Sequence, residues 1–213
     1  MTNHKFTGLA IGLLLIIFTL NLAGQSLSVQ DSLQFAEGMK KMAANTKTIQ
    51  SNFTQEKHSS FLTMAIKSEG KFYYQKENKI RWEYNKPYEY TIILSGGSVM
   101  INDGGRKSEY DMAGNKIFEE INSVMIATVS GDITDSERFN VSMKKEGKLL
   151  QVTLHPKQKQ ISQILSQIIL YISPKDYTVT SLKMVEPNND YTFIKFMEQR
   201  INESIPANTF SFN

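Results

Sequence analysis

The sequence predicts a mainly β protein with a few helices, in which one long antiparallel sheet curls strongly. Short segments of alternating apolar and polar residues follow one another from about residue 48 to residue 198. Turn residues separate these segments at short and even spacing, which favours an antiparallel meander over βαβ units. A sheet of ten or eleven strands accumulates too much twist to stay flat, so we expect it to curl.

The first 24 residues have the composition of a secretory signal peptide. Lys5 precedes the apolar run Leu9–Leu20, and Leu22–Gly24 offers small residues for cleavage. The run is too short for a comfortable membrane span, and a retained anchor helix is the alternative. We therefore divide the chain into a signal peptide (1–24) and a single domain (25–213). The net charge of +3 becomes +2 on cleavage, because one lysine and no acid is removed.

The domain is expected to begin with a helix over residues 26–45. Leu33 and Met39 lie on one mainly apolar stripe of this helix. Ser28 or Asp31 could cap its start. Immediately after the helix the apolar period changes to two, so the helix should lead directly into the first strand.

The next strands are short and are separated by turn residues. They are predicted at Phe61–Lys67, Lys71–Gln75, Ile80–Tyr84, Glu89–Leu94, Ser98–Asn102 and Lys107–Tyr110. Ser95-Gly96-Gly97 and Asp103-Gly104-Gly105 predict tight hairpin turns, where glycine takes a positive φ without strain. In the strand KIRWEYNKP, alternation puts Trp82 on one face with Ile80 and Tyr84.

The second half of the domain starts with another helical pattern, between residues 115 and 131. Strands then resume at Phe139–Lys144, Leu149–Leu154, Gln167–Ile172, Val179–Glu186 and Tyr191–Glu198. Residues 161–172 also fit a helix, and we favour a short helical turn or loop that leads into the strand. The tail after Pro206 is expected to lie along a sheet edge.

The sequence offers no constellation of residues for catalysis or metal binding. Absence of cysteine excludes disulfides, thiol catalysis and an acylated N-terminal cysteine. His4, His58 and His155 are far apart and have no acid at metal-ligand spacing. The glycine pairs lack the strand–loop–helix setting of a phosphate loop, and no nucleophile elbow is present. We therefore expect no enzymatic activity, no metal and no cofactor, and the near-neutral charge does not favour nucleic acid.

One stretch carries a family resemblance. SNFTQEK is followed by SEGKFYYQKENKIRWEYNKPYEYTIILSGGSVMINDGG, that is, a Phe-Thr-Gln strand, a glycine before aromatic residues, and Arg-Trp-Glu-Tyr before a proline. This order, most distinctive over residues 51–103, resembles the LolA family of periplasmic lipoprotein carrier proteins. The resemblance implies an incomplete, strongly curved antiparallel barrel whose open side is covered by two or three helices.

The resemblance also implies a function in the periplasm. Such carriers collect triacylated lipoproteins from a release complex at the inner membrane and hold their acyl chains in a hydrophobic cavity under a helical lid. They pass the lipoproteins to an acceptor at the outer membrane and use no metal or nucleotide. We expect a monomer that contacts membrane proteins transiently. An arginine of an Arg-Pro pair latches the lid in well-studied members, and here that pair falls on Lys76-Glu77, so Lys76 is the candidate latch. Lysine keeps the charge but lacks the planar, multi-donor fork.

A carrier of this kind needs a large apolar surface, because each methylene that leaves a bilayer costs about 0.8 kcal/mol. The candidate lining from the sheet is Phe72, Tyr74, Trp82, Tyr84, Ile92, Leu94 and Met100. The helices would add Leu33, Met39, Ile117, Phe118, Ile121, Met125 and Ile126. Each of these residues could instead be ordinary core. Two other functions remain open: an exported half-barrel that binds or senses a lipid or hydrophobic peptide without transport, and a structural envelope protein.

Overall fold

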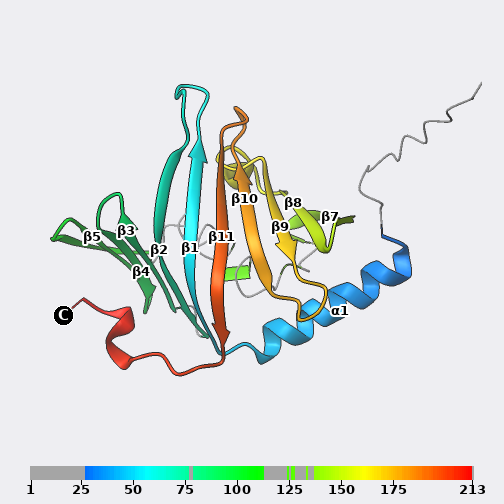
Figure 1. Cartoon of the computed structure of the whole chain (residues 1–213), viewed down its shortest axis with the longest axis horizontal. Coiled ribbons are helices and arrows are strands. Elements are labelled where there is room, and N and C mark those ends of the chain that lie inside the picture. The colour runs from blue at the N-terminus through cyan, green and yellow to red at the C-terminus, as the bar shows by residue number, and fades with distance from the viewer. Residues whose placement is uncertain are drawn as a thin grey trace, which may run out of the picture.

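The computed structural model describes residues 27–76, 79–112, 124, 126–127, 133 and 137–212. Within them, eleven antiparallel strands form one sheet that is not closed, and helices are few (Figure 1). This confirms the predicted fold class. The predicted signal peptide lies outside the described residues. No helix in the described part of the chain is long and apolar enough to span a membrane.

The described elements follow in the order that the sequence predicts, and most of the helix expected between residues 115 and 131 lies outside the described residues. The helical elements are α1 (Val29–Asn45), α3 (Lys159–Ser162) and the 3-10 helix η1 (Ala207–Phe210). The strands are β1 (Thr48–His58), β2 (Ile66–Gln75), β3 (Lys79–Lys86), β4 (Tyr90–Ser95), β5 (Ser98–Asp103), β6 (Arg106–Asp111), β7 (Phe139–Glu146), β8 (Leu149–Pro156), β9 (Gln167–Ile172), β10 (Val179–Val185) and β11 (Tyr191–Ile201).

The strand order explains how the sheet acquires a cover. It runs β6-β5-β4-β3-β2-β1-β11-β10-β9-β8-β7, so the first and last strands pair near the centre. The two edge strands, β6 and β7, are therefore consecutive along the chain. The connection between them therefore joins the two edges of the sheet. Its described residues Met112, Val124 and Ile133 are buried in the core cluster of the sheet.

The helix α1 forms as the sequence predicts, and the structure selects its cap. The backbone N–H of Asp31 donates to Ser28 Oγ at 3.0 Å, so Ser28 is the N-cap. Asp31 lies in the first turn, where its charge complements the helix dipole. The helix ends before Thr46, whose hydroxyl donates to the Met42 carbonyl at 2.8 Å.

Two local predictions are wrong. Residues 61–65 are not strand: they belong to the loop between β1 and β2, and β2 runs without interruption from residue 66 to residue 75. Gly70 lies inside this strand and does not end it. Its missing side chain makes room for the Phe53 ring, whose Cζ would lie 2.8 Å from an added Cβ. The tail does not follow a sheet edge either. Its helix η1 packs on the internal strands β3 and β4, and Arg81 Nη1 donates to the Thr209 carbonyl at 3.2 Å.

Candidate functional site

The face of the sheet that carries Trp82, here called the inner face, is aromatic over β1, β2, β3 and β11. Register places Phe72 opposite Trp82, and Phe53 opposite Phe196. The Trp82 ring centroid lies 4.8 Å from that of Phe72 and 5.1 Å from that of Phe53. All four side chains are buried. They form a packed aromatic group on one half of the inner face.

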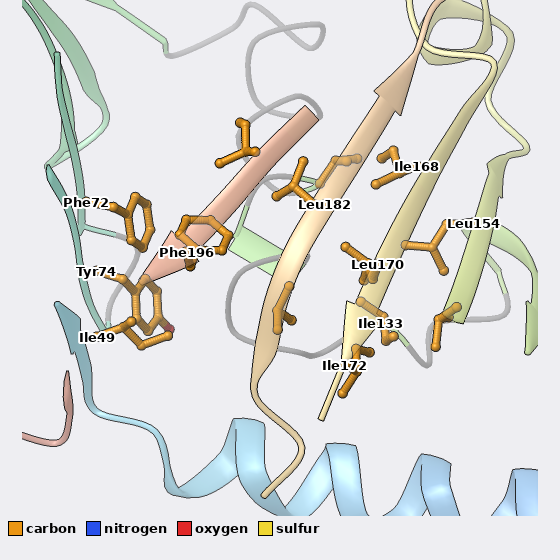
Figure 2. Close-up of a cluster of buried hydrophobic side chains, with 14 of the residues drawn as sticks. Ile49, Phe72, Tyr74, Ile133, Leu154, Ile168, Leu170, Ile172, Leu182 and Phe196 are labelled. Carbon is orange, nitrogen blue, oxygen red and sulfur yellow. The ribbon is translucent and has the colours of Figure 1, made fainter. Parts of the chain in front are cut away.

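The other half of the inner face is aliphatic. Cross-strand pairs join Leu182 to Leu170 and Leu170 to Val152, so branched side chains form continuous rows over β8, β9 and β10. Figure 2 shows both halves turning their side chains toward the same interior. The buried aliphatic members are Leu150, Val152, Leu154, Ile168, Leu170, Ile172, Val179, Leu182 and Ile194.

Side chains from outside the sheet cover this apolar face. Phe35 and Met39 reach it from α1, and Val124 and Ile133 reach it from the β6–β7 connection. Ile133 is fully buried and belongs to the same core cluster as Leu170 and Ile172 (Figure 2). Where α1 meets the aromatic half, the remaining space is about 10 Å³, no more than a single water requires. The covered interior is therefore closely packed at this end.

Trp82 has an unusual polar feature at the centre of the aromatic group. Its Nε1 atom is buried and has no hydrogen-bond partner among the described residues. A buried donor without a partner costs about 1–3 kcal/mol. By contrast, the hydroxyl of the partly buried Tyr84 donates to Gln55 Oε1 at 3.0 Å.

Most predicted lining residues that the structure describes lie on the covered apolar face. Phe72, Tyr74, Trp82, Leu94 and Met39 are buried in its core cluster; Tyr84, Ile92 and Ile126 are partly buried and pack against it. Their role in binding a ligand stays a prediction. Ile117, Phe118, Ile121 and Met125 lie outside the described residues.

The structure places Met100 on the opposite, outer face. It pairs with Ile93, which in turn pairs with Arg81. The turn between β4 and β5 holds two residues, since Ser95 pairs directly with Ser98. A two-residue turn puts Val99 and Ile101 on the inner face, and a shift of one residue exchanges the two faces of a strand. The expectation that Met100 lines the cavity is therefore wrong.

Leu33 is also placed differently from the prediction. Its side chain is 62% exposed, whereas Phe35 and Met39 are the buried residues of α1. The helix carries apolar residues on more than one side, and helical spacing alone does not tell which side the sheet covers. Phe35 was missing from the predicted lining, as were Phe53 and Phe196. Alternation along β1 and β11 was the signal that could have identified Phe53 and Phe196.

Besides the packing of Phe35 and Met39, two contacts of α1 bear on how it is held over the inner face. At its C-terminus, Lys76 Nζ donates to the Ala44 carbonyl at 3.1 Å. The last turn of α1 has no basic residue of its own, so Lys76 supplies a cation at the negative end of the helix dipole.

The second contact is between α1 and the loop after β9. The Tyr177 ring lies 5.5 Å from that of Phe35 and rests on Gly38. A Cβ at Gly38 would lie 2.6 Å from Tyr177 Oη and closer still to Cζ, so this approach requires glycine. The absent side chain thus forms a notch in the helix for an aromatic ring.

Comparisons with known proteins agree on a family. A family model described as "Outer membrane lipoprotein carrier protein LolA" matches residues 44–213. The outer-membrane lipoprotein carrier protein of Pseudomonas fluorescens (strain Pf0-1) is 24% identical over 174 residues, 81% of each chain. That of Pseudomonas putida (strain W619) is 23% identical over 206 residues, 96% of this chain and 94% of the relative. Among solved structures, an uncharacterized conserved protein from Thermus thermophilus has a TM-score of 0.52 at 9% identity. That match covers 86% of this chain and 95% of the other, and it supports the fold alone.

Proposed function

The chain belongs to the LolA family of outer membrane lipoprotein carrier proteins, and from this premise we propose that it is a periplasmic carrier that shields lipoprotein acyl chains. Its cargo would be triacylated lipoproteins, taken from a release complex at the inner membrane and passed to an acceptor at the outer membrane. The observation that carries the proposal is the broad apolar inner face, covered by side chains from α1 and from the β6–β7 connection.

The cost of moving an acyl chain explains why such a face is needed. The transfer of an acyl chain of about fifteen methylenes from a bilayer to water has a free-energy cost of about 12 kcal/mol. Apolar contacts that replace the bilayer are non-directional. Binding therefore requires area and not a particular set of polar groups. This accounts for a proposed site without catalytic or metal-binding residues.

Release requires that the empty state be nearly as favourable as the loaded one. In the structure, Phe35, Met39 and Ile133 occupy the inner face, and the space left where Met42 of α1 meets Phe72 and Phe196 is about 10 Å³, no more than a single water requires. Cargo that binds this part of the inner face must displace these side chains. The cover and the cargo compete for the same surface, and the loaded and empty states exchange at modest net cost.

We assign to Lys76 the role of a weak latch on this cover. Its bond to the Ala44 carbonyl is exposed to solvent, so it can bias closure only slightly. A cation at a helix C-terminus contributes about 0.3–1 kcal/mol. A latch of this size leaves most of the closing free energy to apolar packing.

A two-step transfer experiment tests the proposal. Protein purified after export from its own host is analysed for bound lipid and lipoprotein by mass spectrometry. It is then incubated with inner-membrane vesicles that contain labelled lipoproteins, and the soluble complex is transferred to outer-membrane vesicles. A carrier takes up labelled lipoprotein from the inner-membrane vesicles and releases it to the outer-membrane vesicles. Uptake without release indicates a binding or sensing protein, and the absence of uptake contradicts the proposal.

A further inference from the structure

The loop between β1 and β2, residues 59–65, presents large apolar side chains to solvent. Phe61 is 88% exposed, Met64 is 81% exposed and Leu62 is 47% exposed. Ile66, at the start of β2, is 46% exposed. Four adjoining exposed apolar side chains of this size are more than the scattered single residues that are normal on a protein surface. We call this group the hairpin tip.

The hairpin tip projects from the end of the sheet that lies opposite α1 (Figure 1). It has a defined base, because the neighbouring β10–β11 turn holds it. The backbone N–H of Ser60 and the hydroxyl of Ser59 both donate to the Asp190 carboxylate, at 2.8 Å each. These bonds hold the pKa of Asp190 below its usual value, so the carboxylate stays charged at neutral pH. The apolar side chains are thus displayed by an anchored loop.

The hairpin tip itself carries no charge. Residues 59–65 include no ionisable side chain. The lysines at its base have acidic partners: Lys57 Nζ lies 2.9 Å from Glu186 Oε1, and Lys67 Nζ lies 3.2 Å from Glu56 Oε1. Attraction to a charged partner is therefore not the basis on which this surface would bind.

An amphipathic layer lies directly below the hairpin tip. Tyr191 stacks on His58 at 4.3 Å between ring centroids, and Lys183 Nζ lies 3.7 Å above the Tyr191 ring. Tyr88, in the β3–β4 loop, is a further exposed aromatic side chain. Apolar side chains at a tip, followed by tyrosine and lysine, match the order of environments from the acyl region of a bilayer to its headgroups.

The shape of the surface distinguishes a bilayer from a protein partner. A stable protein interface buries about 800 Å² on each side, contributed by about 20–30 residues. A single projecting loop of seven residues presents far less than this. A bilayer needs no complementary shape and accepts any apolar side chain that reaches its acyl region.

We infer that the hairpin tip docks this protein on the surface of a phospholipid bilayer, with Phe61, Leu62 and Met64 inserted at the boundary of the acyl region. Such an anchor is small, so docking is weak and reversible. The inference does not depend on lipoprotein transport, because a docking loop would act whatever the inner face carries.

Flotation with phospholipid vesicles tests the inference. The exported protein is mixed with vesicles of phosphatidylcholine, or of phosphatidylethanolamine and phosphatidylglycerol, and the bound fraction is measured with and without high salt. The expected result is binding to both kinds of vesicle with little effect of salt. Phe61→Ser combined with Met64→Ser should lower the partition coefficient at least tenfold. Val29→Ser is the matched control, since Val29 is 80% exposed at the start of α1, away from the hairpin tip (Figure 1), and it should change nothing.

Site-specific labelling gives a second measurement. The chain has no cysteine, so Thr63→Cys takes a single environment-sensitive dye at the hairpin tip, and Ser108→Cys takes the same dye on the edge strand β6. Emission from the first should shift to the blue with vesicles, and emission from the second should not. Three results would overturn the inference: no vesicle binding by the unmodified protein, equal loss in the Val29 control, or binding only to anionic vesicles that salt abolishes. Dimerisation through the hairpin tip without vesicle binding would assign the surface to a second copy instead.

Discussion

The replacement Gly38→Ala is the most direct test of how α1 is held over the inner face. In an isolated helix, alanine is favoured over glycine by about 1 kcal/mol. In the folded protein the new methyl group would overlap the Tyr177 ring, which must then leave its place against the helix. The ring would lose its contact with Phe35 and about 50 Å² of buried surface, together about 2 kcal/mol.

This loss acts on the closed arrangement alone. Alanine stabilises the helix equally whether α1 is docked or displaced, so closure should weaken by about 2 kcal/mol. That corresponds to an affinity about 30 times higher for a ligand that binds only the open arrangement. The assay is the binding of a fluorescent apolar probe such as N-phenyl-1-naphthylamine. Urea unfolding, measured in parallel, should show a net loss of stability of about 1 kcal/mol.

The background of the substitution provides the decisive comparison. With Tyr177→Ala already present, the obstructing ring is gone, and Gly38→Ala should become stabilising by about 1 kcal/mol. The effect of the same substitution should therefore change sign between the two backgrounds. If Gly38→Ala destabilises the protein equally in both, or probe affinity does not rise, Tyr177 does not hold α1 through the glycine notch.

Three further predictions follow from the same geometry. Lys76→Ala should raise probe affinity about two- to fivefold by removing the cation at the α1 C-terminus, whereas Lys76→Arg should not; a change above tenfold would contradict a weak latch. Gly70→Ala should lower the free energy of unfolding by about 3 kcal/mol, because the added Cβ would overlap the Glu83 carbonyl oxygen, a backbone atom that cannot move away. A loss below about 1 kcal/mol in urea unfolding would contradict this close approach. Burial raises the pKa of Tyr84 to about 12. The neutral Tyr84 hydroxyl therefore contributes its full stabilisation below about pH 10, the pKa of tyrosine in the unfolded chain. As the pH rises from there toward 12, this contribution to the free energy of unfolding falls by about 1.4 kcal/mol per pH unit. Urea unfolding of Tyr84→Phe, which should lack this decline, provides the control.

Local alternation was sufficient to orient the strand that carries Trp82. Ile80 and Trp82 are buried on the inner face, because successive side chains of a strand point to opposite sides whatever the rest of the chain does. The same reasoning failed at Met100, since each turn resets the alternation. A two-residue turn and a three-residue turn put opposite faces of the next strand on the inner side. The sequence Ser95-Gly96-Gly97 fits either turn.

Apolar residues without a fixed geometric context were harder to place. Phe61 and Met64 belong to a run with strand-like composition, yet both are exposed in a loop. Leu33 fits the apolar stripe of α1 but faces solvent. The burial of such a side chain depends on what packs against it, and that neighbour comes from another part of the chain.

The sequence by itself determined the meander of short antiparallel strands, the leading helix and the family, because these depend on local periodicity and on a contiguous motif. Only the tertiary structure decided that β1 pairs with β11, which makes β6 and β7 the edges, and that Val124 and Ile133 from the connection between them lie in the core cluster. It also decided that α1 is held by Lys76 and by Tyr177. Contacts between residues so far apart in the chain have no signal in the local apolar pattern of the sequence, because they depend on how the complete sheet curls.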